Sequence, residues 1–247
     1  WNIQDLPDTD GIYPTLSGSS EPTSNSLALF GRPWSQLTPD EKRYSFHCCT
    51  DWSLMSRLVV QAGCAGPGST VERIMALLCL TAFHDIMKVE DLLPTVSERH
   101  APYLGYAAGI QIRDHDIAIS YVMEHFPELL PSFVGLPVKE KEVLMFTQGK
   151  MQFNHGWFVQ AEAPPGYMLK TFKEELRVGA SARDISFYFL HWFTDLAGAE
   201  PTPLGGAEKF VLKFPHAILA AFLWSMPFLE NLATKQETEV FESYLAA

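Results

Sequence analysis

Positive charge is scarce in this sequence. Its 247 residues include 18 Lys and Arg against 29 Asp and Glu, which gives a formal net charge of −11. A protein that binds a nucleic acid backbone needs a basic surface to meet the phosphates, so the charge balance argues against a nucleic acid polymer as partner. A small anionic substrate is compatible with it, because a bound metal ion supplies local positive charge.

Long apolar runs and paired cysteines are also lacking. No uninterrupted run of 18 apolar residues occurs, and the apolar stretch 217–224 is too short to span a bilayer, so we expect no membrane segment. The four cysteines show no CxxC zinc spacing. Cys48 and Cys49 are adjacent and cannot readily pair with each other. We therefore expect a reduced, intracellular protein of the cytoplasm. The other two cysteines are Cys64 and Cys79.

Strand signals are weak as well. No Asn-Gly or Asp-Gly turn joins two strand-like segments, and the sequence has neither βαβ alternation nor an internal repeat. The pattern predicts an all-α fold with at most one short hairpin near 151–160. Residues 1–38, rich in Pro, Gly, Ser, Thr and Asp, predict an extended arm or linker. A single helical domain over 39–247 follows.

Capping residues and helix breakers divide this domain into helices. Thr38 and Glu41 have the spacing of a capping box that opens a helix, and Gly63 ends that helix. Ser69 or Thr70 would cap the next one. The predicted helical stretches are 38–62, 71–89, 110–125, 140–154, 172–177, 182–196, 209–232 and 234–247.

Histidine and aspartate residues fall on successive helical stretches. His84 and Asp85 stand at the polar end of the apolar stretch 71–89. Adjacent helical positions diverge by about 100°, so this pair would straddle a site that other helices complete. Imidazole and carboxylate ligands together suit zinc, iron, manganese or nickel. The further candidate ligands, each on its own stretch, are His47, His115, His155 and Asp195.

This ordered set resembles the HD-domain superfamily of metal-dependent enzymes. LTAFHDIMKV is similar to the AALLHDIGKV-type signature, and YSFH at 44–47 with LMSRLVVQAG looks like the family's first helix. IRDHDIAISYVME at 112–124 is similar to the third-histidine helix of the two-metal branch. FNHGW at 153–157 stands where that branch has its next histidine, and AEAPPG where it has a Gly- and Pro-rich loop. FTDLAGAEPTP at 193–203 resembles the closing aspartate segment.

The resemblance implies an HD-type helical bundle that holds two divalent metal ions, iron or manganese first, with zinc, nickel or magnesium as alternatives. Lys88, kept from the signature, would meet a substrate phosphate as a point charge. Asp195 or a nearby carboxylate would orient the attacking water. The implied ligands are His47, His84, Asp85 and Asp195 for one ion, and His115 and His155 with the bridging Asp85 for the other.

Departures from the family pattern bear on the reaction. Met87 replaces the glycine before Lys88, and Arg43 stands where some members carry a glutamate ligand, which argues against a third metal. The segment around His155 lacks the double histidine and Gly-Tyr-Pro of cyclic-dinucleotide phosphodiesterases. We expect a phosphohydrolase or phosphodiesterase that attacks a small phosphate ester or nucleotide through a metal-bound hydroxide.

Two alternatives stay open. One is an oxygenase of the same superfamily, in which a mixed-valent di-iron centre activates O2 to cleave a C–H or C–C bond. The other is a degenerate HD domain that serves as an interaction or sensor module. The complete ligand set favours an enzyme over the module, whereas the missing phosphodiesterase motif favours the oxygenase over the hydrolase.

Structural roles compete with ligation at several of these residues. A solvated helix face explains the Asp-His-Asp run around His115, and a helix C-cap explains His155. His191 precedes Asp195 by four residues, so it could share a helix face with it as an outer or substitute ligand. We expect the aromatic residues of 187–193 to lie in the core. The remaining histidines, predicted to lie on the surface or in loops, are His100, His125 and His216.

Overall fold

The structure, a computed structural model, describes residues 31, 36–38, 40–41, 44, 52–151, 153, 165–198 and 216–246. These residues are mostly helical and contain no strand, only isolated β-bridges, so the all-α prediction is confirmed for them. None of the described helices is long and apolar enough to cross a membrane. The arm predicted over 1–38 and the hairpin predicted near 151–160 lie almost entirely outside the described residues.

Eight helices of eight residues or more make up most of the described chain. They are α3 (Trp52–Gln61), α4 (Val71–Phe83), α5 (His115–His125), α7 (Val138–Met145), α9 (Pro165–Arg177), α10 (Ala182–Gly198), α12 (His216–Ser225) and α14 (Glu237–Leu245). The shorter elements are η3 (Ile86–Lys88), η4 (Glu90–Leu92), η5 (Glu98–His100), η6 (Pro127–Leu129), α6 (Pro131–Val134), the π-helical turn η7 (Phe146–Lys150), η8 (Met226–Phe228) and α13 (Leu229–Leu232).

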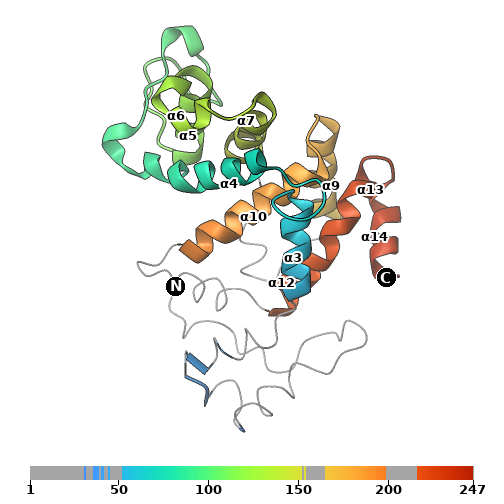
Figure 1. Ribbon diagram of the computed structural model, residues 1–247. Coiled ribbons are helices and arrows are strands. Elements are labelled where there is room, and N and C mark those ends of the chain that lie inside the picture. The colour runs from blue at the N-terminus through green and yellow to red at the C-terminus, as the bar shows by residue number, and fades with distance from the viewer. Residues whose placement is uncertain are drawn as a thin grey trace.

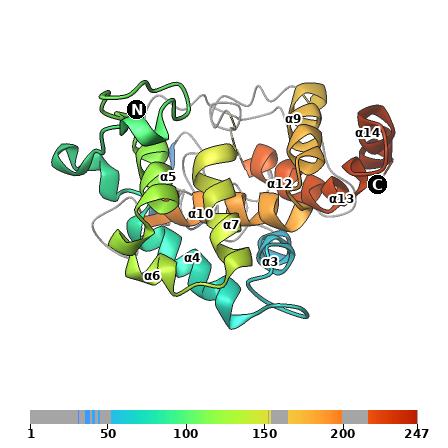
Figure 2. The ribbon, with the colours of Figure 1, turned by 90° about the horizontal axis from the view of Figure 1, so that it is seen from above.

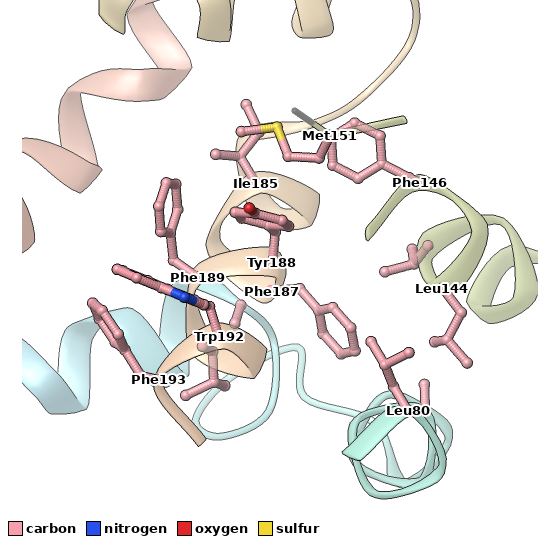
Figure 3. Close-up of a cluster of buried hydrophobic side chains, with 14 of the residues drawn as sticks. Leu80, Leu144, Phe146, Met151, Ile185, Phe187, Tyr188, Phe189, Trp192 and Phe193 are labelled. Carbon is pink, nitrogen blue, oxygen red and sulfur yellow. The ribbon is translucent and has the colours of Figure 1, made fainter. Parts of the chain in front are cut away.

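Helix α10 occupies the middle of this arrangement. It packs against α3, α4 and η7. Figures 1 and 2 show α4 to α7 gathered on one side of it and α9 and α12 to α14 on the other. Its sequence explains the position, because Ile185, Phe187 and Phe189 are fully buried and bury large apolar surfaces. Figure 3 shows Phe187 pointing toward Leu80 and Leu144, and Phe189 lying on the other side of the helix with Trp192 and Phe193. The aromatic residues of 187–193 are buried, so the predicted aromatic core is confirmed.

Helix α4 ends earlier than the sequence predicts. The Thr70 side chain caps its start by accepting a hydrogen bond from the Arg73 backbone N–H, as expected. The predicted stretch 71–89, however, stops being α-helical at Phe83, and the chain tightens into the 3-10 turn η3. Asp85 is the residue between the C-cap His84 and this turn. The break therefore falls at the candidate site.

Helix α5 begins later than predicted, at His115 instead of residue 110. Asp114 is the reason, because its Oδ1 accepts hydrogen bonds from the backbone N–H groups of Asp116 and Ile117. This N-cap places His115 and Asp116 in the first turn. The helix predicted over 140–154 also differs from the observed one. Helix α7 ends at Met145, and the chain continues from Phe146 as the wider π-turn η7.

A buried arginine joins three of these helices. Arg73 on α4 is 1% exposed and donates through Nη1 to Glu140 of α7 at 3.0 Å and through Nη2 to Asp184 of α10 at 2.8 Å. Its Nε donates to the Ala62 carbonyl, and the guanidinium lies over the Phe187 ring. Burial raises the pKa of Asp184, but hydrogen bonds from Ser181 and Arg73 outweigh this and lower it. The network holds α4 against α7 and α10.

Candidate metal centre

His84 presents one ring nitrogen to a group of carboxylates. Its Nδ1 lies 3.1 Å from the Thr81 carbonyl oxygen, so Nδ1–H donates and the lone pair of the neutral ring is on Nε2. Nε2 lies 3.0 Å from Oδ1 of Asp195 and 3.4 Å from Oδ1 of Asp85. Burial lowers the pKa of His84, but the hydrogen bond and charge of Asp195 outweigh it, with a smaller contribution from Asp85, and raise it. The backbone contact on Nδ1 is the arrangement that orients metal-bound histidines.

Asp195 reaches this group from near the end of α10. Its partial burial raises the pKa of the carboxyl, whereas the hydrogen bond and charge of His84 lower it, and the net direction is downward. The side chain is therefore an anion at neutral pH. Because α10 packs against α4, the contact between Asp195 and His84 is a direct result of the core packing.

Asp85 lies between two histidines. Its Oδ1 is 3.4 Å from Nε2 of His84 and 3.7 Å from Nε2 of His115. That oxygen is buried and has no hydrogen-bond partner in the described part of the chain. Oδ2 instead accepts from Nζ of Lys88 at 2.6 Å. A buried carboxylate oxygen without a partner costs free energy, and a cation between the two rings would offset that cost.

The distances in this group are compatible with coordination of a shared cation. Imidazole and carboxylate donors bind a cation such as zinc at about 2.0–2.2 Å, so two donors on one ion lie about 3–3.5 Å apart at octahedral or tetrahedral angles. The spacing of His84 Nε2 from Asp195 and from Asp85 falls within this range. All three residues can bring ligand atoms within 4.8 Å of one another. They can therefore hold a metal ion.

A second group of possible ligands lies at the start of α5. Asp114, His115 and Asp116 also bring ligand atoms within 4.8 Å of one another. Nε2 of His115 is 3.5 Å from Oδ1 of Asp116, which also accepts a 3.0 Å hydrogen bond from Gln148 of η7. Burial raises the pKa of Asp116 above its ordinary value, with the nearby Asp114 adding to the effect and His115 opposing it. Neither Asp116 nor Gln148 is among the ligands that the sequence predicts.

His191 lies against the first group without belonging to it. It is 5% exposed, and its ring meets that of His84 edge to face, with 4.8 Å between the ring centres. Its Nδ1 is buried with no partner in the described part of the chain. Burial, followed by the charge of His84, lowers the pKa of His191 to about 4. The ring is therefore neutral and packs against the ring of His84.

Part of the predicted site is described and part is not. Two predicted ligands, His47 for one ion and His155 for the other, lie outside the described residues. The same holds for the FNHGW segment apart from Phe153. Lys88 lies beside Asp85, as expected of a residue at the mouth of the site. The predicted ligands that the structure brings together are His84, Asp85, His115 and Asp195.

Two histidines predicted to lie on the surface form a separate cluster. His100 and His125 stack with 3.8 Å between ring centres at the far end of α5. The His100 Nε2 accepts from Arg99, while its Nδ1 contacts the Tyr121 hydroxyl at 3.0 Å. Loss of water around the ring lowers the pKa of His100, and the charges of His125 and Arg99 add to this. With its nitrogens already used in this way, His100 serves to hold the loop onto α5.

Comparisons of the chain with protein-family models, with curated proteins and with solved structures found no match.

Proposed function

We propose that this chain is an HD-type, metal-dependent phosphohydrolase or phosphodiesterase that acts on a small phosphate ester or nucleotide. The observation that carries the proposal is the Oδ1 atom of Asp85, which is buried, has no hydrogen-bond partner among the described residues and lies 3.4 Å from Nε2 of His84 and 3.7 Å from Nε2 of His115. A bridging carboxylate between two imidazoles is a donor set for a pair of divalent cations. The order of the ligands along the sequence supports the same assignment.

The chain's own residues would divide the work at this site. Two divalent ions, when bound, would activate a water molecule and neutralise charge that develops on a phosphoryl group. His84 and Asp195, at the ends of α4 and α10, would bind one ion. Asp85 would be shared between that ion and the one that His115 binds. The remaining ligands proposed from the resemblance are His47 and His155. Iron or manganese suits these donors best, with zinc, nickel or magnesium as alternatives.

Lys88 is placed to receive the substrate. Its side chain is 55% exposed, and its ammonium group lies 2.6 Å from Oδ2 of Asp85. An exposed lysine can turn its ammonium toward an incoming phosphate, because its stem is flexible and its three donors rotate freely. Asp195, anionic and one-third exposed, is placed to orient a water molecule through its free lone pairs. These two residues therefore supply substrate charge neutralisation and water orientation.

The donor set also supports a second candidate, a di-iron oxygenase that cleaves a C–H or C–C bond. Imidazole and carboxylate donors also suit iron, and His84, His115, Asp85 and Asp195 supply both kinds. Lys88 alone gives limited charge neutralisation for a bound phosphate. An oxygenase, in contrast, does not need to neutralise a charged leaving group.

Elemental analysis and electron paramagnetic resonance on anaerobically purified protein test the two candidates. Manganese, zinc, nickel or magnesium, together with turnover in a panel of nucleotides and phosphate esters, is the result expected for the hydrolase. About two irons per chain with a mixed-valent signal and no phosphatase turnover would replace it with the oxygenase. A chain that binds no divalent ion would overturn both, and a non-catalytic interaction or sensor module would then be the better account.

A further inference from the structure

We infer that Asp116 is a ligand of the second cation position, together with Asp85 and His115, and that Gln148 holds its carboxylate in place. The inference rests on the proposed function, because it concerns the same metal centre. It adds a residue that the ordered histidines and aspartates of the sequence did not include. It also assigns a role to the π-turn η7, which the helical pattern did not predict.

The geometry around His115 supports this assignment. Its Nε2 lies near two carboxylate oxygens, Oδ1 of Asp116 at 3.5 Å and Oδ1 of Asp85 at 3.7 Å. Both separations exceed the 2.7–3.2 Å of a good hydrogen bond. They are close to the spacing of about 3–3.5 Å between donors that share one cation. One nitrogen facing two anionic oxygens at these distances is the arrangement that a cation would complete.

Gln148 gives Asp116 a fixed orientation without cancelling its charge. Its Nε2 donates to Oδ1 of Asp116 at 3.0 Å. A neutral amide leaves the carboxylate with its full negative charge and a second lone pair. Carboxylate ligands are commonly held by such an outer hydrogen bond. The contact therefore fits a ligand and its supporting residue.

The π-turn brings Gln148 to this position. Gly149, the next residue, lies so close to α5 that a Cβ atom there would meet Oγ of Ser120 at 2.8 Å. A larger residue at 149 would push η7 and α5 apart. π-helical turns widen a helix by one residue and often occur at functional sites. Here the turn places an amide donor next to the first turn of α5.

The neighbouring Asp114 has a structural explanation that Asp116 lacks. Oδ1 of Asp114 accepts two backbone hydrogen bonds, at 3.0 and 3.1 Å, as the N-cap of α5. That role accounts for its position without a metal. Asn is as good an N-cap as Asp, so Asp114→Asn removes one charge near the site while keeping the cap. It is the matched control for Asp116→Asn.

The test is a calorimetric titration of the metal-free chain with Mn²⁺, followed by electron paramagnetic resonance of the loaded protein. We expect the wild type and Asp114→Asn to bind two ions per chain with a spin-coupled signal. Asp116→Asn should bind one ion tightly, lose at least 100-fold in affinity for the second, and show an uncoupled signal. Gln148→Ala should weaken the second ion by about 10–100-fold, the usual effect of an outer-shell change.

Failure of the inference is distinguishable from failure of the proposed function. Two ions of unchanged affinity in Asp116→Asn would overturn the assignment of Asp116 and leave the dinuclear hydrolase in place. A single ion in the wild type would remove the second position, and with it this inference, but would leave a mononuclear hydrolase. A wild type that binds no ion would overturn the proposed function itself.

Discussion

Oδ1 of Asp195 lies 3.0 Å from Nε2 of His84, across 111 residues of sequence. The contact joins the end of α10 to the end of α4, two helices that pack against each other. Each residue stabilises the charge state of the other, since the pKa of His84 is raised and that of Asp195 is lowered. A metal ion bound here would take over the position that this hydrogen bond holds.

Asp195→Asn should abolish tight binding of the first ion. The amide keeps the shape of the side chain but removes the negative charge that a cation needs. We expect a loss of more than 100-fold in affinity, above the 10–100-fold typical of outer-shell changes, with an unchanged helical circular dichroism spectrum. Glu242→Gln on α14 is the control for removal of an acidic charge. Metal content equal to wild type would show that Asp195 is not a ligand.

His84→Ala and Asp85→Ala should likewise lose metal while staying helical.

Lys88→Met should impair substrate use and leave metal content and stability almost unchanged. The Lys88 ammonium is exposed, and a surface ion pair of this kind contributes about 0–1 kcal/mol to folding. Loss of a positive charge that meets a phosphate should raise KM for a phosphate ester by at least tenfold. Lys170→Met, which removes an equally exposed lysine on α9, serves as the comparison. Equal KM values in the two variants would exclude a substrate-binding role for Lys88.

His191→Phe separates an outer packing role from ligation. Phenylalanine keeps a ring against His84 but has no nitrogen to bind a metal. Since the Nδ1 atom of His191 is buried and unpaired in the described part of the chain, we expect unchanged or slightly higher stability and full metal content. His191→Ala should be less stable by about 2–4 kcal/mol, because it leaves a cavity. Loss of metal in His191→Phe would identify His191 as a ligand.

Arg73→Met should destabilise the fold more than any of these changes. It leaves the buried carboxylate of Glu140 and the partly buried carboxylate of Asp184 without their guanidinium partner. Breaking a buried ion pair in this way costs about 3–5 kcal/mol, which urea denaturation would measure. Arg177→Met, at an exposed position at the end of α9, should change stability by less than about 0.5 kcal/mol. Similar midpoints for the two variants would contradict the role of the network.

The Arg73 network should also make stability depend on acid pH. The pKa of Asp184 is lower in the folded chain than the ordinary value of about 3.9. Its contribution is therefore fully present above that ordinary value and is lost as pH falls through the folded-state pKa. Asp184→Asn should cost about 1.5–3 kcal/mol at pH 7, with the difference from wild type shrinking below about pH 4. Urea midpoints between pH 7 and 3 measure this, with Asp91→Asn as control. A pH-independent difference would refute it.

Local sequence signals predicted several features of the site. The Thr70 cap, the apolar pattern of α4 and the carboxylate near the end of α10 were enough to bring His84 and Asp195 to neighbouring helices. These signals are short-range or periodic, so they can be detected in a single sequence. The weak strand signals of the sequence agree with the absence of strands from the described residues. The HD-type topology and the two-metal assignment stay predictions.

Other features depend on contacts that no local pattern encodes. Arg73 resembles a surface residue in the sequence, and only the approach of α7 and α10 makes it a buried cation. Asp116 resembles a solvated helix residue until η7 brings Gln148 beside it. The break after Phe83 went unpredicted because the apolar pattern continues past it into the 3-10 turn η3. In each case the deciding interaction comes from a distant segment or from a subtle change of helix type.

The position of α10 links the candidate metal centre to the packing of the described core. Its buried aromatic residues and its Asp195 belong to one rigid rod, which packs directly against α4 and His84. An ion that binds only the folded chain stabilises it in proportion to its affinity and concentration. Opening fluctuations that separate α10 from α4 would have to break the coordination sphere. Amide hydrogen exchange in both helices should therefore slow together when the ion binds. The fraction of chains with a bound ion would then determine how often the packing of α4 against α10 opens.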